Sequence, residues 1–193
     1  MFNWFAYLTY IVITAFTPGP NCIMSMHSAG TYGLRKSYPF NLGVFCGFSI
    51  VMLICTMFSA MLFKFLPSIK PVMQVVGAGY MLYLAWKTWR SSFKSKDDKK
   101  TSTTFLSGAL LQFVNPKVML CGITALSSYI LPHFSAIPVL IGFALLHAFT
   151  GFSGTILWAF FGMAFSALFT KYPKLINGIL ALLLVYCAVS LFL

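Results

Sequence analysis

The sequence predicts an all-α membrane protein in which six transmembrane helices form two inverted three-helix repeats, with helices 1 and 4 broken at proline. The first observation is composition: 60% of the 193 residues are hydrophobic and only 8% are charged, against about 25% charged in an average soluble domain. The second is the length of the apolar runs, each near the ~20 residues that a span needs. The third is a repeated proline spacing. A soluble enzyme and a disordered chain are both excluded.

Three spans are expected in the first half of the chain. The first covers about 4–26 and is interrupted by Pro18-Gly19-Pro20, because proline has no N–H to donate to the preceding turn. The second covers about 39–63 and the third about 71–89, and each is opened by a proline. Together they use the whole first half and leave no room in it for a soluble domain.

A polar linker at 91–104, expected in the cytoplasm, separates the halves and holds both acidic residues of the chain. The fourth span covers about 105–131 and is interrupted at Asn115-Pro116. The fifth covers about 137–165 and the sixth about 173–193. The second half thus repeats the order of the first, with a broken span followed by two further spans.

Prolines mark corresponding positions in the two halves. Three pairs lie 98 to 102 positions apart: Pro18 and Pro116, Pro39 and Pro138, and Pro71 and Pro173. This spacing predicts one repeat at 1–90 and a second at 105–193. Three spans are an odd number, so the second repeat must enter the membrane from the opposite side. Inverted repeats of this kind are the plan of many secondary transporters.

Basic residues predict the orientation. Ten of the thirteen fall in the loops after spans 1, 3 and 5: Arg35, Lys36, Lys87, Arg90, Lys94, Lys96, Lys99, Lys100, Lys171 and Lys174. The opposite side has Lys64 and Lys70 only. Positively charged loops stay in the cytoplasm, so both termini are expected in the periplasm. The net charge of +11 is thereby assigned to topology, and nucleic acid is not expected as a partner.

The first candidate site is Thr17-Pro18-Gly19-Pro20-Asn21, midway along an apolar run. A helix broken there leaves carbonyl acceptors before the break and N–H donors after it. Broken backbone at membrane depth is tolerated only where it faces protein or a watery cavity. We therefore expect a substrate-binding role, with a simple packing kink as the alternative.

The counterpart in the fourth span is Asn115-Pro116-Lys117. Pro116 is expected to free a carbonyl near Gln112. Lys117 is the basic residue expected deep inside a span, where an ammonium costs about 2.5–3.5 kcal/mol on insertion scales. Such a residue usually serves a function, so we expect all four to contribute to the binding site. The alternative is that Lys117 extends to the interface.

His147 lies within the fifth span and could relay protons, because imidazole titrates near neutral pH; a plain hydrogen bond to a neighbouring helix is the alternative. Neither acidic residue lies in a span, and no metal, haem or nucleotide motif is present, so no cofactor is expected. The five cysteines have no CxxC spacing. We expect them to be buried thiols, which disfavours a membrane thiol-redox protein.

These motifs resemble the LysE/RhtB family of bacterial amino-acid exporters over essentially the whole chain. The resemblance is carried by Thr17-Pro18-Gly19-Pro20-Asn21, Asn115-Pro116-Lys117, Gly77-Ala78-Gly79-Tyr80 and Leu84-Ala85-Trp86-Lys87. Within the family the chain is most similar to the cysteine/O-acetylserine exporters. One departure is Cys22, where family members often have a second Asn.

The resemblance implies a secondary transporter, not an enzyme, that exports a small neutral amino acid across the bacterial inner membrane by proton-coupled antiport. The missing carboxylates within the spans fit a zwitterion, which brings its own. Export of another amino acid, such as homoserine or threonine, is an alternative. Two alternatives from other classes are a membrane thiol-redox protein and a non-transporting subunit. Homo-oligomerisation also stays open.

Overall fold

The computed structural model describes residues 2–57, 59–91, 104–189 and 192, with α4 side chains described at 71, 72 and 74–90. Within these ranges every regular element is a helix, which confirms the all-α prediction. In chain order the elements are α1 (Trp4–Phe16), α2 (Pro20–Tyr32), α3 (Leu34–Met57), α4 (Ser59–Ser91), α5 (Phe105–Val114), α6 (Pro116–Thr124), the π-helix η2 (Ala125–Ile130), α7 (Ile137–Ala164), α8 (Ser166–Lys171) and α9 (Pro173–Val189).

Both predicted interruptions are confirmed as breaks between helices. The chain leaves the helical conformation between α1 and α2, where Pro20 occupies the first turn of α2. The second break is at Asn115, and the axis of α5 makes an angle of 62° with that of the α6–η2 segment. Proline is well tolerated at the first helical position, so Pro20 and Pro116 each start a new helix.

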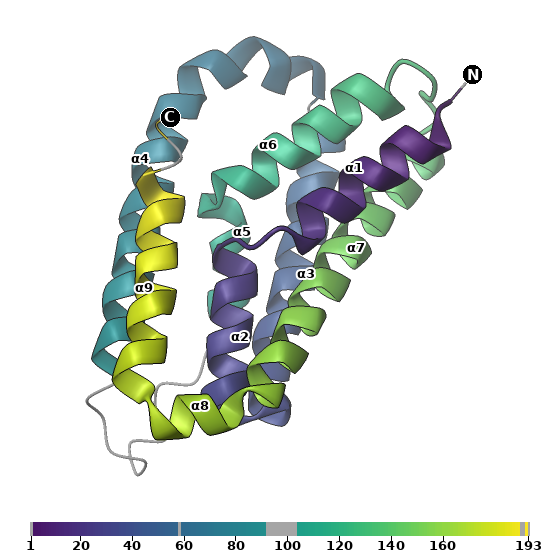
Figure 1. The fold of residues 1–193 in the computed structure, drawn as a ribbon. Coiled ribbons are helices and arrows are strands. Elements are labelled where there is room, and N and C mark those ends of the chain that lie inside the picture. Colours follow the sequence, from purple (N-terminus) through teal and green to yellow (C-terminus); the bar gives the residue numbers. More distant parts are fainter. Residues whose placement is uncertain (1, 58, 92–103, 190–191, 193) are drawn as a thin grey trace.

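Two of the predicted starting points were wrong. Helix α3 begins at Leu34, so Pro39 lies inside it, and α4 begins at Ser59, so Pro71 lies inside it as well. A membrane helix tolerates internal proline when neighbouring groups satisfy the freed carbonyl. Figure 1 shows that α4 curves strongly along its length. The short helix α8 and the π-helix η2 were not predicted. The linker 91–104 lies outside the described residues except at its two ends.

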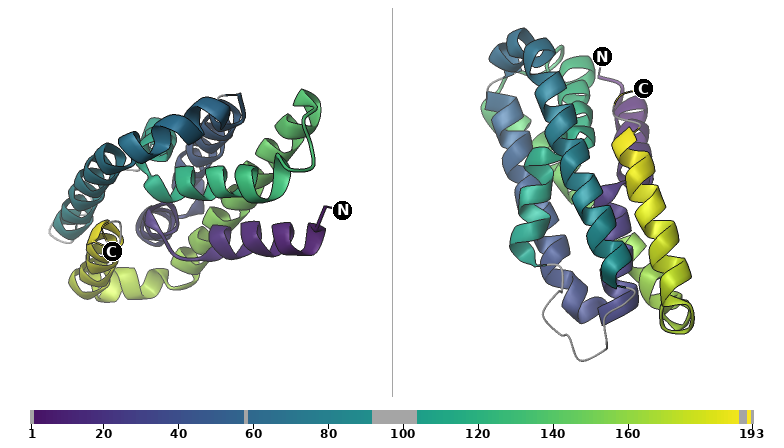
Figure 2. Two further views of the ribbon diagram at one scale, coloured as in Figure 1. Left: turned by 90° about the horizontal axis from the view of Figure 1, so that it is seen from above. Right: turned by 90° about the vertical axis from the view of Figure 1, so that its left-hand side faces the viewer.

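The helices pack in pairs around α3 and α7. Helix α3 packs along α5 and α7, α2 packs along α7, and α4 packs along α9. Figure 1 shows α4 and α9 side by side, with α6 crossing above α2 and α8 lying below it. The views in Figure 2 show the same pairing of α4 and α9 from two other directions.

Small residues allow α3 and α5 to approach closely. A Cβ atom on Gly43 would overlap the carbonyl of Phe105, and one on Gly47 would overlap the backbone of Ala109. The two glycines are four residues apart and so face the same side of α3. Helix contacts of this kind are typical of membrane proteins, where association depends on van der Waals packing.

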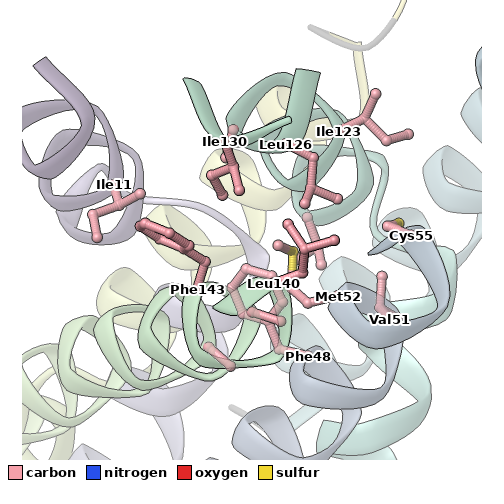
Figure 3. Packing of buried hydrophobic residues seen from close by; sticks show 14 of the residues in the cluster. Ile11, Phe48, Val51, Met52, Cys55, Ile123, Leu126, Ile130, Leu140 and Phe143 are labelled. Carbon is pink, nitrogen blue, oxygen red and sulfur yellow. The ribbon is translucent and has the colours of Figure 1, made fainter. Parts of the chain in front are cut away.

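One apolar cluster fills the space between the ends of α1, α3, α6 and α7. Figure 3 shows Leu140 of α7 beside Met52 and Phe48 of α3, the ring of Phe143 turned toward Ile11 of α1, and Ile130 of η2 above them. Met52 and Ile130 have no exposed surface. This cluster covers the end of the molecule nearest the chain termini (Figure 1).

Among the described residues, two helices, α3 and α7, are long and apolar enough to cross a membrane on length and composition. The bent segment Phe105–Ile130 makes a third when it is counted as one span. Helices α1 and α9 are apolar but shorter. Many large apolar side chains are exposed on these helices, including Phe5 at 82% and Leu182 at 70%, as expected for a surface that faces lipid.

Candidate functional site

The first break separates the last turn of α1 from the first turn of α2. Thr17 has an extended conformation, and its N–H and its hydroxyl both donate to the carbonyl of Ile13, at 3.0 and 2.6 Å. Gly19 is also extended and caps α2. The first turn of α2 therefore presents the N–H groups of Asn21 and Cys22, which have no helical partner.

The second break is a single residue, Asn115. Its side-chain oxygen accepts a hydrogen bond from the N–H of Lys117 at 3.1 Å, which caps α6. Asn115 is 1% exposed. Because the cap and Pro116 start a new helix at an angle to α5, the side chain of Lys117 is directed away from the α5 axis toward the first break.

Lys117 joins the two breaks. Its Nζ donates to the carbonyl of Thr17 at 2.9 Å, across 100 residues of sequence. The side chain also passes over Gly19, so that a Cβ there would lie 3.3 Å from Nζ and 3.4 Å from Cδ. Glycine at this position leaves the lysine side chain enough room. The two acidic residues of the chain lie at 97 and 98, outside the described residues, and the recorded partner of Lys117 is a backbone carbonyl.

A pair of amide side chains makes a second connection between the breaks. Asn21 Nδ2 donates to Gln112 Oε1 at 2.8 Å, and Gln112 Nε2 donates to Asn21 Oδ1 at 3.1 Å. Gln112 Nε2 also donates to the carbonyl of Gly108 at 2.8 Å. Gln112 has no exposed surface. This reciprocal pair holds α2 against α5 and satisfies most of the polar groups of both amides.

A cavity opens between the two breaks. It holds about 40 Å³, or about three water molecules at roughly 10–15 Å³ each. Six of the ten predicted site residues line it: Gly19, Pro20, Asn21, Asn115, Lys117 and His147. It thus brings together residues from three separate spans of the predicted topology.

Four predicted residues lie beside the cavity without lining it. Thr17 and Pro18 are exposed, and Thr17 contributes its carbonyl, not its hydroxyl, to the bond with Lys117. Pro116 is buried and packs close to Gly77 of α4. Gln112 acts through Asn21. The breaks are therefore brought together as predicted, while the polar contribution of Thr17 comes from the backbone.

Eight further residues line the cavity that were not predicted. Five are neighbours of the breaks: Thr14, Ala15, Cys22, Val118 and Cys121. Three come from the long helices: Phe48, Gly151 and Thr155. Helical spacing is the signal that could have found several of them, since Cys121 is four residues from Lys117, and Gly151 and Thr155 are four and eight from His147.

His147 is 2% exposed, and its Nδ1 atom has no hydrogen-bond partner in the described structure. Its ring lies 5.3 Å from that of Phe48. An unpartnered buried nitrogen is unusual, because burying a polar group without a hydrogen bond is costly. The cavity that His147 lines is the space from which a substrate or water could reach this side chain.

The electrostatic character of the cavity is two-sided. The end of α1 presents carbonyl oxygens, and the start of α2 presents N–H groups at the positive end of the helix dipole. Lys117 adds one ammonium between them. The arrangement can bind a cation at the carbonyl side and an anion at the N–H side. Phe48 and Val118 provide apolar surface, and Asn115, His147 and Thr155 provide further polar side chains.

A buried polar cluster continues along α2 from the cavity. Ser25 Oγ lies 2.7 Å from Asn41 Oδ1 and 2.8 Å from the carbonyl of Thr155. Asn41 Nδ2 donates to the carbonyl of Ser37 at 3.2 Å. Each of these four residues is at most 1% exposed. The spacing of Asn21 and Ser25, four residues apart on α2, places this cluster one turn from the cavity.

Comparison with protein-family models matches residues 12–193 to the LysE type translocator family. The chain belongs to this family. It is also 41% identical over 187 residues to the cysteine/O-acetylserine efflux proteins of Escherichia coli strain K12 and of Shigella sonnei, covering 97% of this chain and 96% of theirs. No solved structure matches the chain.

Membership of the LysE type translocator family confirms the resemblance found in the sequence. It identifies the chain as a membrane transporter rather than an enzyme, and the apolar helices agree with this assignment. The two proline breaks that carried the resemblance are also the two segments that meet at the cavity.

Proposed function

We propose that this LysE-family transporter exports a small neutral amino acid of the cysteine/O-acetylserine type from the cytoplasm. The names of the relatives that are 41% identical support this substrate class. The observation that carries the proposal is the Lys117 ammonium held 2.9 Å from the Thr17 carbonyl in a cavity between two broken helices.

A zwitterion matches the two sides of this cavity. The substrate carboxylate binds Lys117 and the N–H groups of Asn21 and Cys22, and the substrate ammonium binds the carbonyl side at the end of α1. The apolar wall at Phe48, together with the thiol of Cys121, receives a short side chain. A second positive charge on the substrate would find no carboxylate in the described lining, which supports neutral over cationic amino acids.

The packing supports the six-span inverted repeat as part of this proposal. Exchanging α1 with α5, α2 with α6, α3 with α7 and α4 with α9 turns the most extensive packed pairs into packed pairs, while the α2–α3 contact has no extensive counterpart between α6 and α7. The α3–α5 contact corresponds to α7–α1, the α2–α7 contact to α6–α3, and the α4–α9 contact to itself. The repeats at 1–90 and 105–193 would then enter the membrane from opposite sides.

The orientation with both termini in the periplasm of the bacterial inner membrane is supported by the distribution of charge. The chain termini lie at one end of the molecule in Figure 1, and the start of α3, the end of α4 and helix α8 lie at the other. The second end carries the described basic residues Arg35, Lys36, Lys87, Arg90, Lys171 and Lys174. A reporter fused after Leu193 is expected to be active in the periplasm, and one placed near Lys96 in the cytoplasm.

Proton antiport is proposed as the driving reaction, with His147 as the proton-accepting group. Its buried, unpartnered Nδ1 and its place in the cavity lining support this role. Replacement of His147 by Gln is expected to leave substrate exchange between equal concentrations intact and to abolish accumulation driven by a pH gradient. Equal loss of exchange and of accumulation would assign His147 to substrate binding or to packing instead.

Transport by everted inner-membrane vesicles from cells producing the protein tests the substrate proposal. Radiolabelled O-acetyl-L-serine and L-cysteine are expected to accumulate above the level in vesicles from cells without the protein, and L-lysine is not. Preferential accumulation of L-homoserine or L-threonine would establish the alternative substrate class. No accumulation of any amino acid would contradict the proposal.

A further inference from the structure

The Thr17 carbonyl has the properties of an ammonium-binding site. It ends the last turn of α1, at the negative end of the helix dipole, and it accepts the Lys117 ammonium at 2.9 Å. The carbonyls around it are already bound: Ile13 accepts from Thr17, and Phe16 accepts from Trp158 Nε1 at 3.2 Å. Besides the Lys117 ammonium, the Thr17 carbonyl has the Cys22 thiol at 3.9 Å, a weak donor. Thr17 therefore provides the carbonyl of this turn that binds a cation.

The Lys117 side chain also occupies the space that a substrate needs. The cavity of about 40 Å³ accommodates about three water molecules, fewer than the number of heavy atoms in a cysteine molecule. Displacement of the Lys117 side chain, which lines this cavity, gives an amino acid more room. Lys117 is flexible and partly buried, and its recorded bond is to a single neutral acceptor.

We propose that Lys117 is a tethered substitute for the ammonium group of the substrate, and that the Thr17 carbonyl is the amine-binding site of the transporter. This inference rests on the proposed function and specifies its site. In the empty protein the Lys117 ammonium occupies the carbonyl. When a zwitterion binds, its own ammonium replaces Lys117 there, and Lys117 turns to the substrate carboxylate.

The exchange keeps every charge paired in both states. Before binding, one ammonium is held by one carbonyl. After binding, the substrate ammonium is on that carbonyl and Lys117 faces the carboxylate, so that no buried charge is left without a partner. A ligand with only one of the two groups breaks this balance. An amine displaces Lys117 without supplying the carboxylate that would bind it, and a carboxylate draws Lys117 away without supplying an ammonium to replace it on the Thr17 carbonyl. The site is therefore selective for zwitterions.

Three ligands that share a thiol separate these contributions: L-cysteine has both charged groups, cysteamine has the amine alone, and 3-mercaptopropionate has the carboxylate alone. Binding is measured by thermal stabilisation of the purified, reduced full-length protein in detergent, because a ligand stabilises in proportion to its affinity. The wild type is expected to bind L-cysteine and to bind each of the other two at least about tenfold more weakly, since a hydrogen bond to a charged group contributes about 1.5–3 kcal/mol.

Removing the Lys117 ammonium is expected to reverse the order of affinity between L-cysteine and cysteamine. Lys117→Met vacates the carbonyl, so cysteamine is expected to bind at least about tenfold more tightly than to the wild type, while L-cysteine loses affinity because its carboxylate has no counter-charge. Lys117→Gln, also neutral, provides a second variant if Lys117→Met is poorly produced. Lys36→Met is the matched control, because Lys36 is an exposed lysine at the start of α3, and it is expected to behave as the wild type does.

A second measurement needs no substitution. Cysteamine and formate together supply the charged groups of L-cysteine as separate molecules. In the wild type, formate is expected to raise the affinity for cysteamine, because it gives the displaced Lys117 a partner, and the coupling must be reciprocal. In Lys117→Met, formate is expected to have no effect on cysteamine.

The outcomes distinguish the inference from the proposed function. Equal cysteamine affinity in the wild type and both neutral variants, with no effect of formate, would overturn the amine-site assignment. If those variants also lose L-cysteine, Lys117 is a carboxylate anchor alone and the proposed function stands. Failure of the wild type to bind L-cysteine, O-acetylserine or any other amino acid would refute the proposed function itself.

Discussion

The two proline breaks perform different tasks although they arise from the same kind of sequence. The first leaves three residues outside any helix, and what it presents to the cavity is backbone: the Thr17 carbonyl and the free N–H groups that begin α2. The second is a single residue, closed by its own side chain, and what it presents is the side chain of Lys117.

This difference follows from how each break satisfies its own hydrogen bonds. Pro18 and Pro20 supply no N–H, and Gly19, the N-cap of α2, has no side chain to cap the helix. The Thr17 carbonyl is therefore bound by a side chain from another helix. Asn115 caps α6 with its own side chain, so the second break needs no partner from another helix, and the cap fixes the backbone from which the Lys117 side chain extends. A broken membrane helix can thus bind a ligand through its own backbone groups, or it can position a side chain that binds the ligand.

The largest effect is expected from removing the charge that joins the two breaks. Lys117→Met keeps the length of the side chain and is expected to lower amino-acid export in everted vesicles at least about 30-fold, because losing one partner of a buried charge pair costs about 2–5 kcal/mol. Membrane abundance is expected to hold, because a buried ammonium disfavours insertion. Normal export by this variant would show that Lys117 is not part of the site.

The next effect concerns the neutral connection between the breaks. Asn21→Ala leaves the buried Gln112 amide without its partner, which costs about 1–3 kcal/mol in the free energy of unfolding. Gln112→Ala leaves the half-buried Asn21 amide and is expected to cost less. Because the two side chains bond to each other, the double variant is expected to lose less stability than the sum of the single losses. Thermal unfolding in detergent measures this coupling, and strictly additive losses would show that the breaks are not coupled through these amides.

Some helix boundaries could be predicted from the positions of proline, and others could not. The second broken span, expected at 105–131, matches α5 to η2, and the fifth, expected at 137–165, matches α7 closely, because long apolar runs with proline at their boundaries have few alternatives. The early starts of α3 and α4 could not be predicted from Pro39 and Pro71. Whether an internal proline ends a helix depends on whether tertiary neighbours satisfy the freed carbonyl.

For the site, the sequence identified residues that are anomalous in an apolar run, such as Lys117 and Asn115. It could not identify Phe48 or Gly151, which are ordinary residues of a membrane helix and enter the cavity only because α3 and α7 pack beside the breaks. It also assigned a side-chain role to Thr17, whose hydroxyl is bound within its own helix. Side-chain direction at a break depends on local hydrogen bonds that sequence does not display.

A smaller effect on export is expected from removing the N-cap of α6 at the second break. Asn115→Ala removes the cap of α6, which costs about 1 kcal/mol, and lets Lys117 move relative to Thr17. Export is expected to fall about fivefold, with a higher substrate concentration needed for half-maximal rate. Asn115→Ser restores a capping oxygen and is expected to recover most of the activity, since Ser caps about as well as Asn. Equal export by the Ala and Ser variants would mean that capping does not position Lys117.

The smallest effect is expected at the first break, from a change that spares the backbone. Thr17→Val removes the hydroxyl and keeps the shape of the side chain. That hydroxyl bonds to the carbonyl of Ile13 at 2.6 Å, and the N–H of Thr17 still donates to the same carbonyl at 3.0 Å, so Ile13 keeps a partner. The Thr17 carbonyl, which holds Lys117, is present in any residue. Export of O-acetylserine is therefore expected to change less than about twofold, in line with the usual limit of about 0.5 kcal/mol for substitutions outside a critical contact. A collapse of export at normal abundance would place the Thr17 side chain in the substrate site and contradict the division between a backbone break and a side-chain break.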